Sequence, residues 1–116
     1  MNLNYDYASE WLKKLKEYWV SKNIEGVISL FTKTSYYQET PFLEPYTTFE
    51  QIANEWQNIK NQDIKNIDFK ILAIDKNVLI VEWLFEIDIE VFDGIYEIKF
   101  NDDLECIYFK SWEMEK

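Results

Sequence analysis

The spacing of apolar residues changes once along this chain, and that change constrains the fold more than any other feature. Up to about residue 62 the apolar side chains recur every three or four positions, as in an amphipathic helix. From there onward they alternate with polar residues, as in strands with one buried face. Helices gathered first and strands gathered last predict an α+β domain rather than an alternating α/β one.

Two predicted helices open the chain. Residues 7–19 place Trp11, Leu15 and Trp19 on one face and several lysines on the other, which is the pattern of a helix lying on a core. Asn23 then suits the N-cap of a second, shorter helix, because its side chain can accept a hydrogen bond from a free backbone N–H of the first turn. We therefore expect a helical pair with a tight link.

A short strand and a third helix follow. Residues 35–39 are predicted as a strand that ends before Thr40-Pro41, because proline disfavours helical backbone at the residue before it. Thr48 and Gln51 form a capping-box signature, in which each side chain satisfies a backbone N–H of the other residue. The third helix is predicted to begin there.

Antiparallel strands fill the rest of the sequence. The first two are expected to pair as a hairpin across residues 75–77, with further turns near Asp93-Gly94 and at residues 101–103, and a last strand from 106 to 112. On the first two strands the inward-facing residues are expected to be Ile67, Phe69, Ile71 and Ala73, then Leu79, Val81, Trp83, Phe85 and Ile87.

Aromatic residues are abundant, with five Trp, eight Tyr and eight Phe among 116 residues. Rings bring large, rigid apolar area, and Tyr and Trp add a polar tip, so this number in a small domain predicts a core built around a ring-lined cavity. The chain has no His and no Arg. A histidine base, a histidine metal ligand and an arginine phosphate clamp are therefore excluded, which leaves carboxylates, lysines, tyrosines and hydroxyls.

Length and charge exclude several classes of protein. The chain is expected to form a single domain, 1–116. Its formal net charge of -10 repels phosphate backbones and anionic lipid, so nucleic acid and membranes are not expected partners. The start lacks a secretory signal pattern and no run of about 18 apolar residues occurs, which predicts a cytoplasmic protein. Cys106, the one cysteine, suits a small buried position.

Several stretches, together with the order of elements, carry a family resemblance. The stretches are Tyr36-Tyr37-Gln38-Glu39-Thr40-Pro41-Phe42-Leu43-Glu44-Pro45, Ile52 to Trp56, and Phe92-Asp93-Gly94-Ile95-Tyr96 leading through Phe100 and Cys106 to Trp112. They resemble the SnoaL-like branch of the nuclear transport factor 2 superfamily. The resemblance implies a cystatin-like cone, an α+β fold whose bent antiparallel sheet wraps around three N-terminal helices with a central pocket. It also implies a homodimer packed through the outer face of the sheet.

The resemblance singles out one carboxylate. Members of the superfamily include ketosteroid isomerases, polyketide cyclases and dehydratases, as well as non-catalytic binding and scaffold domains. In the isomerase pattern the general base falls at Glu39, which is a carboxylate as required. The oxyanion-hole tyrosine falls at Leu15 and the second acid at Tyr96, so only one of the three catalytic positions carries the expected type of residue. The last strand reads Lys110-Ser111-Trp112-Glu113, where the family usually has an Arg-Glu-Trp-Trp-like stretch. These departures shift the prediction from enzyme toward binder.

Glu39 is the first candidate for chemistry. If its strand alternates, Glu39 and Tyr37 share one face, and the resemblance turns that face inward. Burial among rings would raise the pKa of the Glu39 carboxyl, and the group could act as a general base or contact a ligand. The alternative is that Glu39 accepts a hydrogen bond from a nearby Tyr or Trp, or meets water at the cavity mouth. Tyr96 is the second catalytic candidate, because its hydroxyl could polarise a carbonyl oxygen.

The expected ligand-binding residues carry a ring or a carboxylate on a position that the fold would turn inward. They are Tyr37, Glu39, Phe42, Trp56, Trp83, Phe85, Tyr96, Phe109 and Trp112. On the last strand alternation alone leaves the inward face open. Either Phe109 and Ser111 look inward, or Trp112 does.

No metal and no cofactor is predicted. Glu82, Glu86, Asp88 and Glu90 alternate with the inward residues, which indicates a solvated or dimer-facing surface, and no loop has the spacing of a calcium motif. Three hypotheses follow: a binding domain for a small hydrophobic or aromatic ligand; an isomerase, cyclase or dehydratase that uses Glu39 as base; and a non-catalytic dimerisation or scaffold module. A core of solidly packed rings would favour the last.

Overall fold

The computed structural model describes residues 2–114 and confirms the predicted order of elements. In chain order the elements are α1 (Tyr5–Val20), α2 (Ile24–Ser29), β1 (Tyr36–Gln38), α3 (Phe49–Trp56), the 3-10 helix η1 (Gln57–Asn61), β2 (Ile64–Asp75), β3 (Val78–Ile87), β4 (Glu90–Phe100) and β5 (Cys106–Met114). The chain is thus α+β, with its long strands in the second half.

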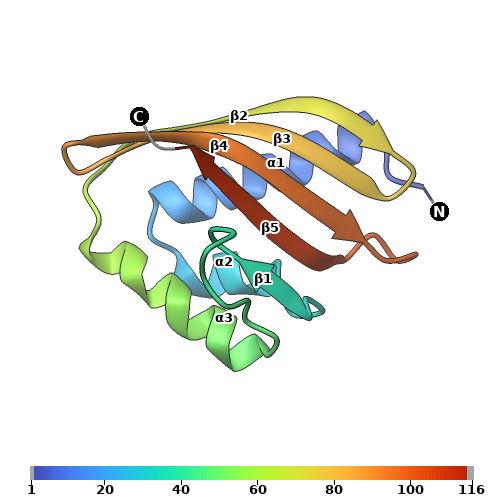
Figure 1. The fold of residues 1–116 in the computed structure, drawn as a ribbon, viewed down its shortest axis with the longest axis horizontal. Helices are drawn as coiled ribbons and strands as arrows, with labels where there is room; N and C mark the ends of the chain where they lie inside the picture. Colours follow the sequence, from blue (N-terminus) through green and yellow to red (C-terminus); the bar gives the residue numbers. More distant parts are fainter. Residues whose placement is uncertain (1, 115–116) are drawn as a thin grey trace.

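The strands form one five-stranded sheet in the order β1-β5-β4-β3-β2. From β2 to β5 the neighbours are antiparallel, whereas β1 joins the edge parallel to β5, with Tyr36 opposite Tyr108. The sheet is therefore mixed at that edge. The long strands arch over the helices, so that α1 crosses beneath the sheet and α2, α3 and β1 close the space below it (Figure 1).

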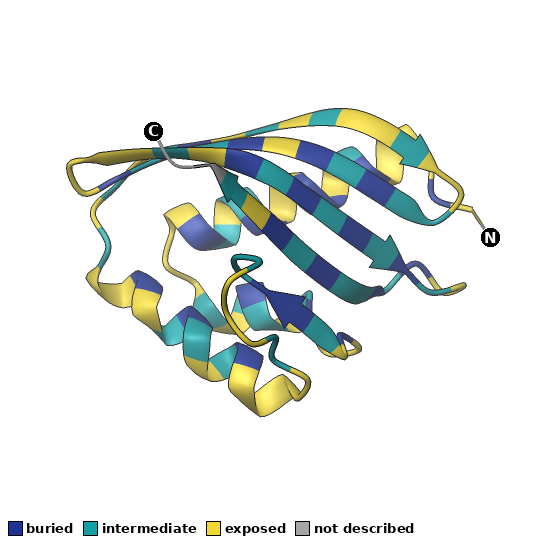
Figure 2. Cartoon of the chain, in the orientation of Figure 1, coloured by how far each residue is buried: buried dark blue, intermediate teal, exposed yellow. Residues whose placement is uncertain are grey.

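One face of the sheet is covered and the other is more open. Buried and less buried residues alternate along β3, β4 and β5 (Figure 2). At the centre of the covered side, Phe31 is fully buried and meets rings from four elements. Its partners are Trp11 of α1, Tyr37 of β1, Trp56 of α3 and Phe109 of β5, with ring centroids 5.2–5.9 Å apart.

The predicted helix starts are confirmed by their caps. Asn23 Oδ1 accepts a hydrogen bond from the Gly26 backbone N–H at 3.0 Å and begins α2. The Thr48 hydroxyl accepts one from the Gln51 N–H at 3.2 Å, and the Gln51 side chain accepts one from the Thr48 N–H, which completes the capping box of α3. Each such cap stabilises a helix by about 1 kcal/mol.

The predicted turn near Asp93-Gly94 is wrong. The chain turns after β3 at residues 88–89, and β4 runs straight through Gly94. Asp88 takes the left-handed backbone conformation of the turn, with φ at 58°, and its carboxylate accepts a hydrogen bond from the Asp63 N–H at 2.9 Å. Gly94 is needed for another reason, because the ring of Trp83 lies directly over its Cα.

The predicted inward face of β2 is wrong at one position. Pairing with β3 skips a residue between Ile71 and Ala73, so a β-bulge interrupts the alternation there. Ala73 is consequently exposed, and Ile74 packs against the core in its place. Strict alternation could not anticipate this, because a bulge moves every later side chain to the other face.

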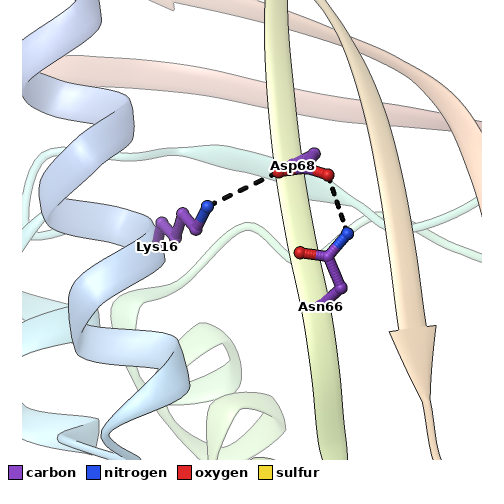
Figure 3. A network of polar contacts seen from close by, with 3 residues as sticks. All are labelled: Lys16, Asn66 and Asp68. Atoms are coloured by element: carbon purple, nitrogen blue, oxygen red, sulfur yellow. Dashed lines mark hydrogen bonds and ion pairs between the residues drawn. The ribbon is translucent and has the colours of Figure 1, made fainter.

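A small polar network links α1 to the sheet (Figure 3). Lys16 Nζ lies 3.5 Å from Asp68 Oδ1 on β2, and Asp68 also accepts a hydrogen bond from Asn66 at 2.7 Å. Both charged side chains are about half exposed, so the ion pair contributes at most about 1 kcal/mol. The helix is held to the sheet mainly by its buried apolar face, which includes Leu12 and Leu15.

We expect Gly94→Ala to destabilise the protein by about 1–3 kcal/mol. A methyl group at this position would overlap the Trp112 carbonyl oxygen and come within 2.5 Å of Trp83 Cζ2, and the backbone cannot yield without breaking strand pairing. Urea unfolding measures the change. The control is Asp93→Ala, an exposed neighbour in the same strand, which should cost no more than about 0.5 kcal/mol. Equal stabilities for the two variants would contradict the account.

Candidate functional site

A cavity of about 310 Å³ lies between the covered face of the sheet and the helices. Its apolar wall is built almost wholly from rings contributed by six elements. They are Trp19 of α1, Tyr37 of β1, Trp56 of α3, Trp83 and Phe85 of β3, Phe92 and Tyr96 of β4, and Phe109 of β5. The rings of this core therefore leave space rather than filling it.

Seven of the nine predicted ligand-binding residues line this cavity: Tyr37, Glu39, Trp56, Trp83, Phe85, Tyr96 and Phe109. The strand periods explain the agreement, since all but Glu39 and Trp56 lie inside strands. The structure also decides the last strand. Phe109 and Ser111 face inward and line the cavity, whereas Trp112 points away from it.

Phe42 and Trp112 do not line the cavity, which corrects their expected placement. Phe42 is 90% exposed, because the chain leaves β1 after Gln38 and carries it out on a surface loop. Trp112 is 41% exposed on the outer face of β5, where Lys110 Nζ lies 3.7 Å from the centre of its ring. Because side chains alternate between the two faces of a strand, Trp112 lies on the face of β5 opposite to that of Ser111.

Sequence reasoning missed two carboxylates in the lining, Glu55 and Glu113. A signal for Glu55 was present: it lies three residues after Ile52 and next to Trp56, on the apolar stripe of its helix. A charged residue on such a stripe faces the interior and needs a partner or a ligand. Glu113 lies two residues after Ser111 and so faces inward on the same side of β5 as Phe109 and Ser111.

Glu39 and Glu55 form a carboxyl pair at one end of the cavity. The Glu55 carboxylate accepts hydrogen bonds from the Tyr46 hydroxyl at 3.0 Å and from Asn58 Nδ2 at 3.2 Å. The pKa of Glu39 is raised to about 7, mainly by burial, with the charge of Glu55, a hydrogen bond between the two side chains and the charge of Glu113 adding to the shift. The Glu39 carboxyl can therefore gain or lose a proton near neutral pH.

Two phenols stand next to this pair. Tyr37 and Tyr96 are 3% and 4% exposed, and burial raises the pKa of each well above its ordinary value, with the charge of Glu39 adding to the shift. Both therefore remain neutral donors. Both residues line the cavity.

The indole N–H groups in the cavity wall differ in whether they have a hydrogen-bond acceptor. Trp19 donates to Gln62 Oε1 at 3.1 Å. The N–H groups of Trp56 and Trp83 are buried without an acceptor in the described part of the chain. An unsatisfied buried donor costs about 1–3 kcal/mol, and such costs are retained mainly at functional sites.

The arrangement can orient a ligand and move a proton. Within residues 2–114 no group of three or more Cys, Asp and Glu side chains could hold a metal ion. No helix in this part of the chain is long and apolar enough to cross a membrane. The chemistry on offer is that of a paired carboxyl, two phenols and the Ser111 hydroxyl.

Compared by sequence, the chain matches no protein-family model and none of the curated proteins. Its structure does resemble solved ones. A SnoaL-like protein of unknown function from Burkholderia thailandensis superposes with a TM-score of 0.74 at 10% identity, over 97% of this chain and 99% of that one. The epoxide hydrolase/cyclase-like enzyme SalBIII, described for pyran ring formation in the polyether salinomycin, gives 0.80 at 8% identity, over 94% and 92%.

A computationally designed 17-OHP binder superposes with a TM-score of 0.73 at 11% identity, over 90% of this chain and 88% of that one. These likenesses confirm the predicted fold, which is that of SnoaL-like proteins and of the wider superfamily related to nuclear transport factor 2. The same fold carries an enzyme in one case and a designed binding site in another, so the fold alone does not choose between these functions.

We expect Glu39→Gln to stabilise the protein at alkaline pH and to leave it unchanged at pH 4. Since the pKa of Glu39 is about 7 in the folded state against an ordinary 4.5, the native protein binds more protons than the unfolded chain between these values. The free energy of unfolding therefore falls as pH rises through that window. Glutamine mimics the protonated acid, so the variant should exceed the parent by about 2–3 kcal/mol at pH 8.

Urea unfolding of parent and variant at pH 4 and pH 8 measures the difference. Glu44→Gln is the matched control, because it removes the same charge from an exposed position in the neighbouring loop. A Glu39→Gln variant no more stable at pH 8 than Glu44→Gln would show that Glu39 is solvated.

Proposed function

We propose that this protein binds a small, mainly apolar molecule with a flat or ring-containing body inside the cavity. The observation that supports this most directly is a void of about 310 Å³ whose wall is made mainly of aromatic rings, with a few carboxyl, amide and hydroxyl side chains among its lining residues. Ligand sites of soluble proteins combine these two properties. The void also favours ligand binding over a pure association module, whose rings would be packed solid.

The ring geometry supports a flat ligand body. Trp83 and Phe85 stack with centroids 4.3 Å apart, and Tyr37 and Phe109 stack at 5.1 Å, so stacked pairs on both sides offer ring faces or edges to a guest. Tyr37 and Tyr96 line the cavity as neutral donors, and their hydroxyls would fix one polar atom of the ligand.

A second candidate function is acid–base catalysis by the Glu39–Glu55 pair. A carboxyl with a pKa of about 7 can give or take a proton near neutral pH, and Glu55 stands beside it to exchange that proton. The likeness to SalBIII and the predicted isomerase-type base at Glu39 support this candidate. Tyr96 would serve as the hydrogen-bond donor to a developing oxyanion.

We further propose that two protomers pair through the outer face of the sheet and that the protein works in the cytoplasm. The exposed ring of Trp112 supports the pairing, together with Leu72 and Val91, which are 47% and 39% exposed on neighbouring parts of the sheet. Sedimentation equilibrium distinguishes one copy from two.

Filling the cavity should abolish binding. Ser111→Leu would project a branched side chain between Tyr96 and Phe109, and we expect ligand affinity to fall at least about tenfold, because the guest loses its space. Tryptophan fluorescence titrated with a panel of polycyclic and aromatic compounds measures binding. The control is Trp112→Leu on the opposite face of the same strand, which should bind as the parent does. If no compound binds the parent, the binding proposal fails.

Catalysis is tested by measuring turnover of two substrates. An epoxide reports ring opening, and an unsaturated steroid ketone reports proton transfer. We expect turnover of at least one, with Glu39→Gln lowering kcat by about 10²–10⁴-fold while the affinity for unreacted ligand is kept. Turnover by Glu39→Gln at the rate of the parent would exclude Glu39 as the acid or base.

A further inference from the structure

The charged side chains that line the cavity within residues 2–114 are all acidic. They are Glu39, Glu55 and Glu113, and no lysine of this described range is among the lining residues. Neither Glu39 nor Glu55 forms an ion pair with a described lysine.

From this arrangement we propose that the ligand is an organic cation, a protonated amine or quaternary ammonium carried on an apolar body. The inference rests on the proposed binding function and names the chemical class of the guest. A carboxylate held among rings is stabilised by protons, hydrogen-bond donors or a positive charge, and no lysine of residues 2–114 lines the cavity.

The rings beside the carboxyls provide the second half of the recognition. Tyr37 and Tyr96 lie close enough to Glu39 for its charge to raise the pKa of both phenols, and Trp56 follows Glu55 on α3 and lines the same cavity. The faces of Tyr and Trp attract cations, with about 0.5–2 kcal/mol gained per contact depending on how far the cation is desolvated. Carboxylates and ring faces together make a site for alkylated ammonium groups.

Other guests fit this end of the cavity less well. A metal ion lacks a ligand set in the described residues. An anion would meet the carboxyl groups of Glu39 and Glu55, and no described lysine lines the cavity to offset them. A neutral molecule could accept a hydrogen bond from the protonated Glu39, but it would gain no charge attraction from the Glu55 carboxylate, which Tyr46 and Asn58 already supply with donors. A cation with alkyl substituents is also weakly hydrated, so it loses less than a bare ammonium ion when it enters a ring-lined space.

The cation should compete with a proton. The groups that face Glu39 are Glu55 on α3, Glu113 on β5, Tyr37 on β1, Tyr96 on β4 and Tyr46 in the loop after β1, and none of them is positively charged. A positive guest would favour the ionised Glu39 and release its proton. Affinity for a quaternary ammonium, which has no proton of its own to lose, should therefore rise with pH.

The direct test compares phenyltrimethylammonium with tert-butylbenzene, which has the same shape and no charge. Quenching of tryptophan fluorescence measures both dissociation constants at pH 8 and pH 6. We expect the cation to bind at least about tenfold more tightly than the neutral isostere at pH 8, and several-fold less tightly at pH 6 than at pH 8. The neutral compound should show no such pH dependence.

Paired variants show where the charge effect arises. Glu39→Gln/Glu55→Gln should lower the affinity for the cation by at least about tenfold and leave that for tert-butylbenzene within about twofold, which also shows that the cavity survives. The control Glu82→Gln/Glu90→Gln removes the same charge from exposed positions outside the cavity and should change neither.

Two results would overturn the inference and leave the binding proposal standing: equal affinity for the two probes, or an equal loss of cation binding in both double variants. Failure of both probes to bind the parent at any pH would overturn the cation inference and count against the binding proposal as well.

Discussion

Edge-to-face packing around Phe31 is the interaction on which the rest of the structure depends. This fully buried ring follows α2 and touches rings from α1, β1, α3 and β5, so it joins each helix to the sheet. Its contacts with Trp11, Tyr37 and Phe109 are nearly perpendicular, with interplanar angles of 86–89°. Such pairs are worth about 0.5–1.5 kcal/mol each beyond the area they bury.

The same packing divides the core into a solid end and a hollow end. Toward the tip of the hairpin formed by β2 and β3, Trp11 packs against Phe31 and Phe100, and the space is filled. Toward the other end Trp19 meets Trp56 and Phe85, and these rings stand around the cavity instead of closing it. The core thus has closely packed rings at one end and rings that line a cavity at the other.

That cavity gives the carboxyl pair its character. Glu39 leaves β1 beside the ring of Tyr37, and Glu55 is delivered by α3, so the two acids meet because the Tyr37 and Trp56 rings both anchor on Phe31. On the surface the pair would be two ordinary carboxylates. Within a ring-lined wall the pKa of Glu39 rises to about 7 and no lysine of the described residues lines the cavity, and the proposed ligand class follows from that imbalance.

Much of this arrangement could be predicted from the sequence because it depends on local signals. The caps at Asn23 and Thr48 fixed two helix starts, alternation placed Trp83, Phe85 and Tyr96 on the inner face, and Cys106 is buried as expected. What escaped prediction depends on long-range geometry. The bulge after Ile71 and the turn at residues 88–89 arise from strand pairing, which no local pattern records.

Phe42 and Glu55 also show the difference between what local sequence indicates and what the three-dimensional fold decides. A phenylalanine next to Pro41 looked like a pocket residue, yet the loop carries it into solvent at 90% exposure. Glu55 was not singled out from the sequence, yet its position on the apolar stripe of α3 turns it into the cavity. Residue type misled for Phe42, whereas position on the helix would have been the guide for Glu55.

The most direct measurement of the central claim is the titration of the Glu39 side-chain carboxyl by 13C NMR, with Glu55→Gln used to assign its neighbour. The account predicts a midpoint near 7 in the parent, because burial and the adjacent carboxylate both oppose ionisation. It also predicts a lower midpoint in Glu55→Gln. A midpoint near the ordinary 4.5 in the parent would mean that Glu39 is solvated, and it would contradict the paired site on which the proposals rest.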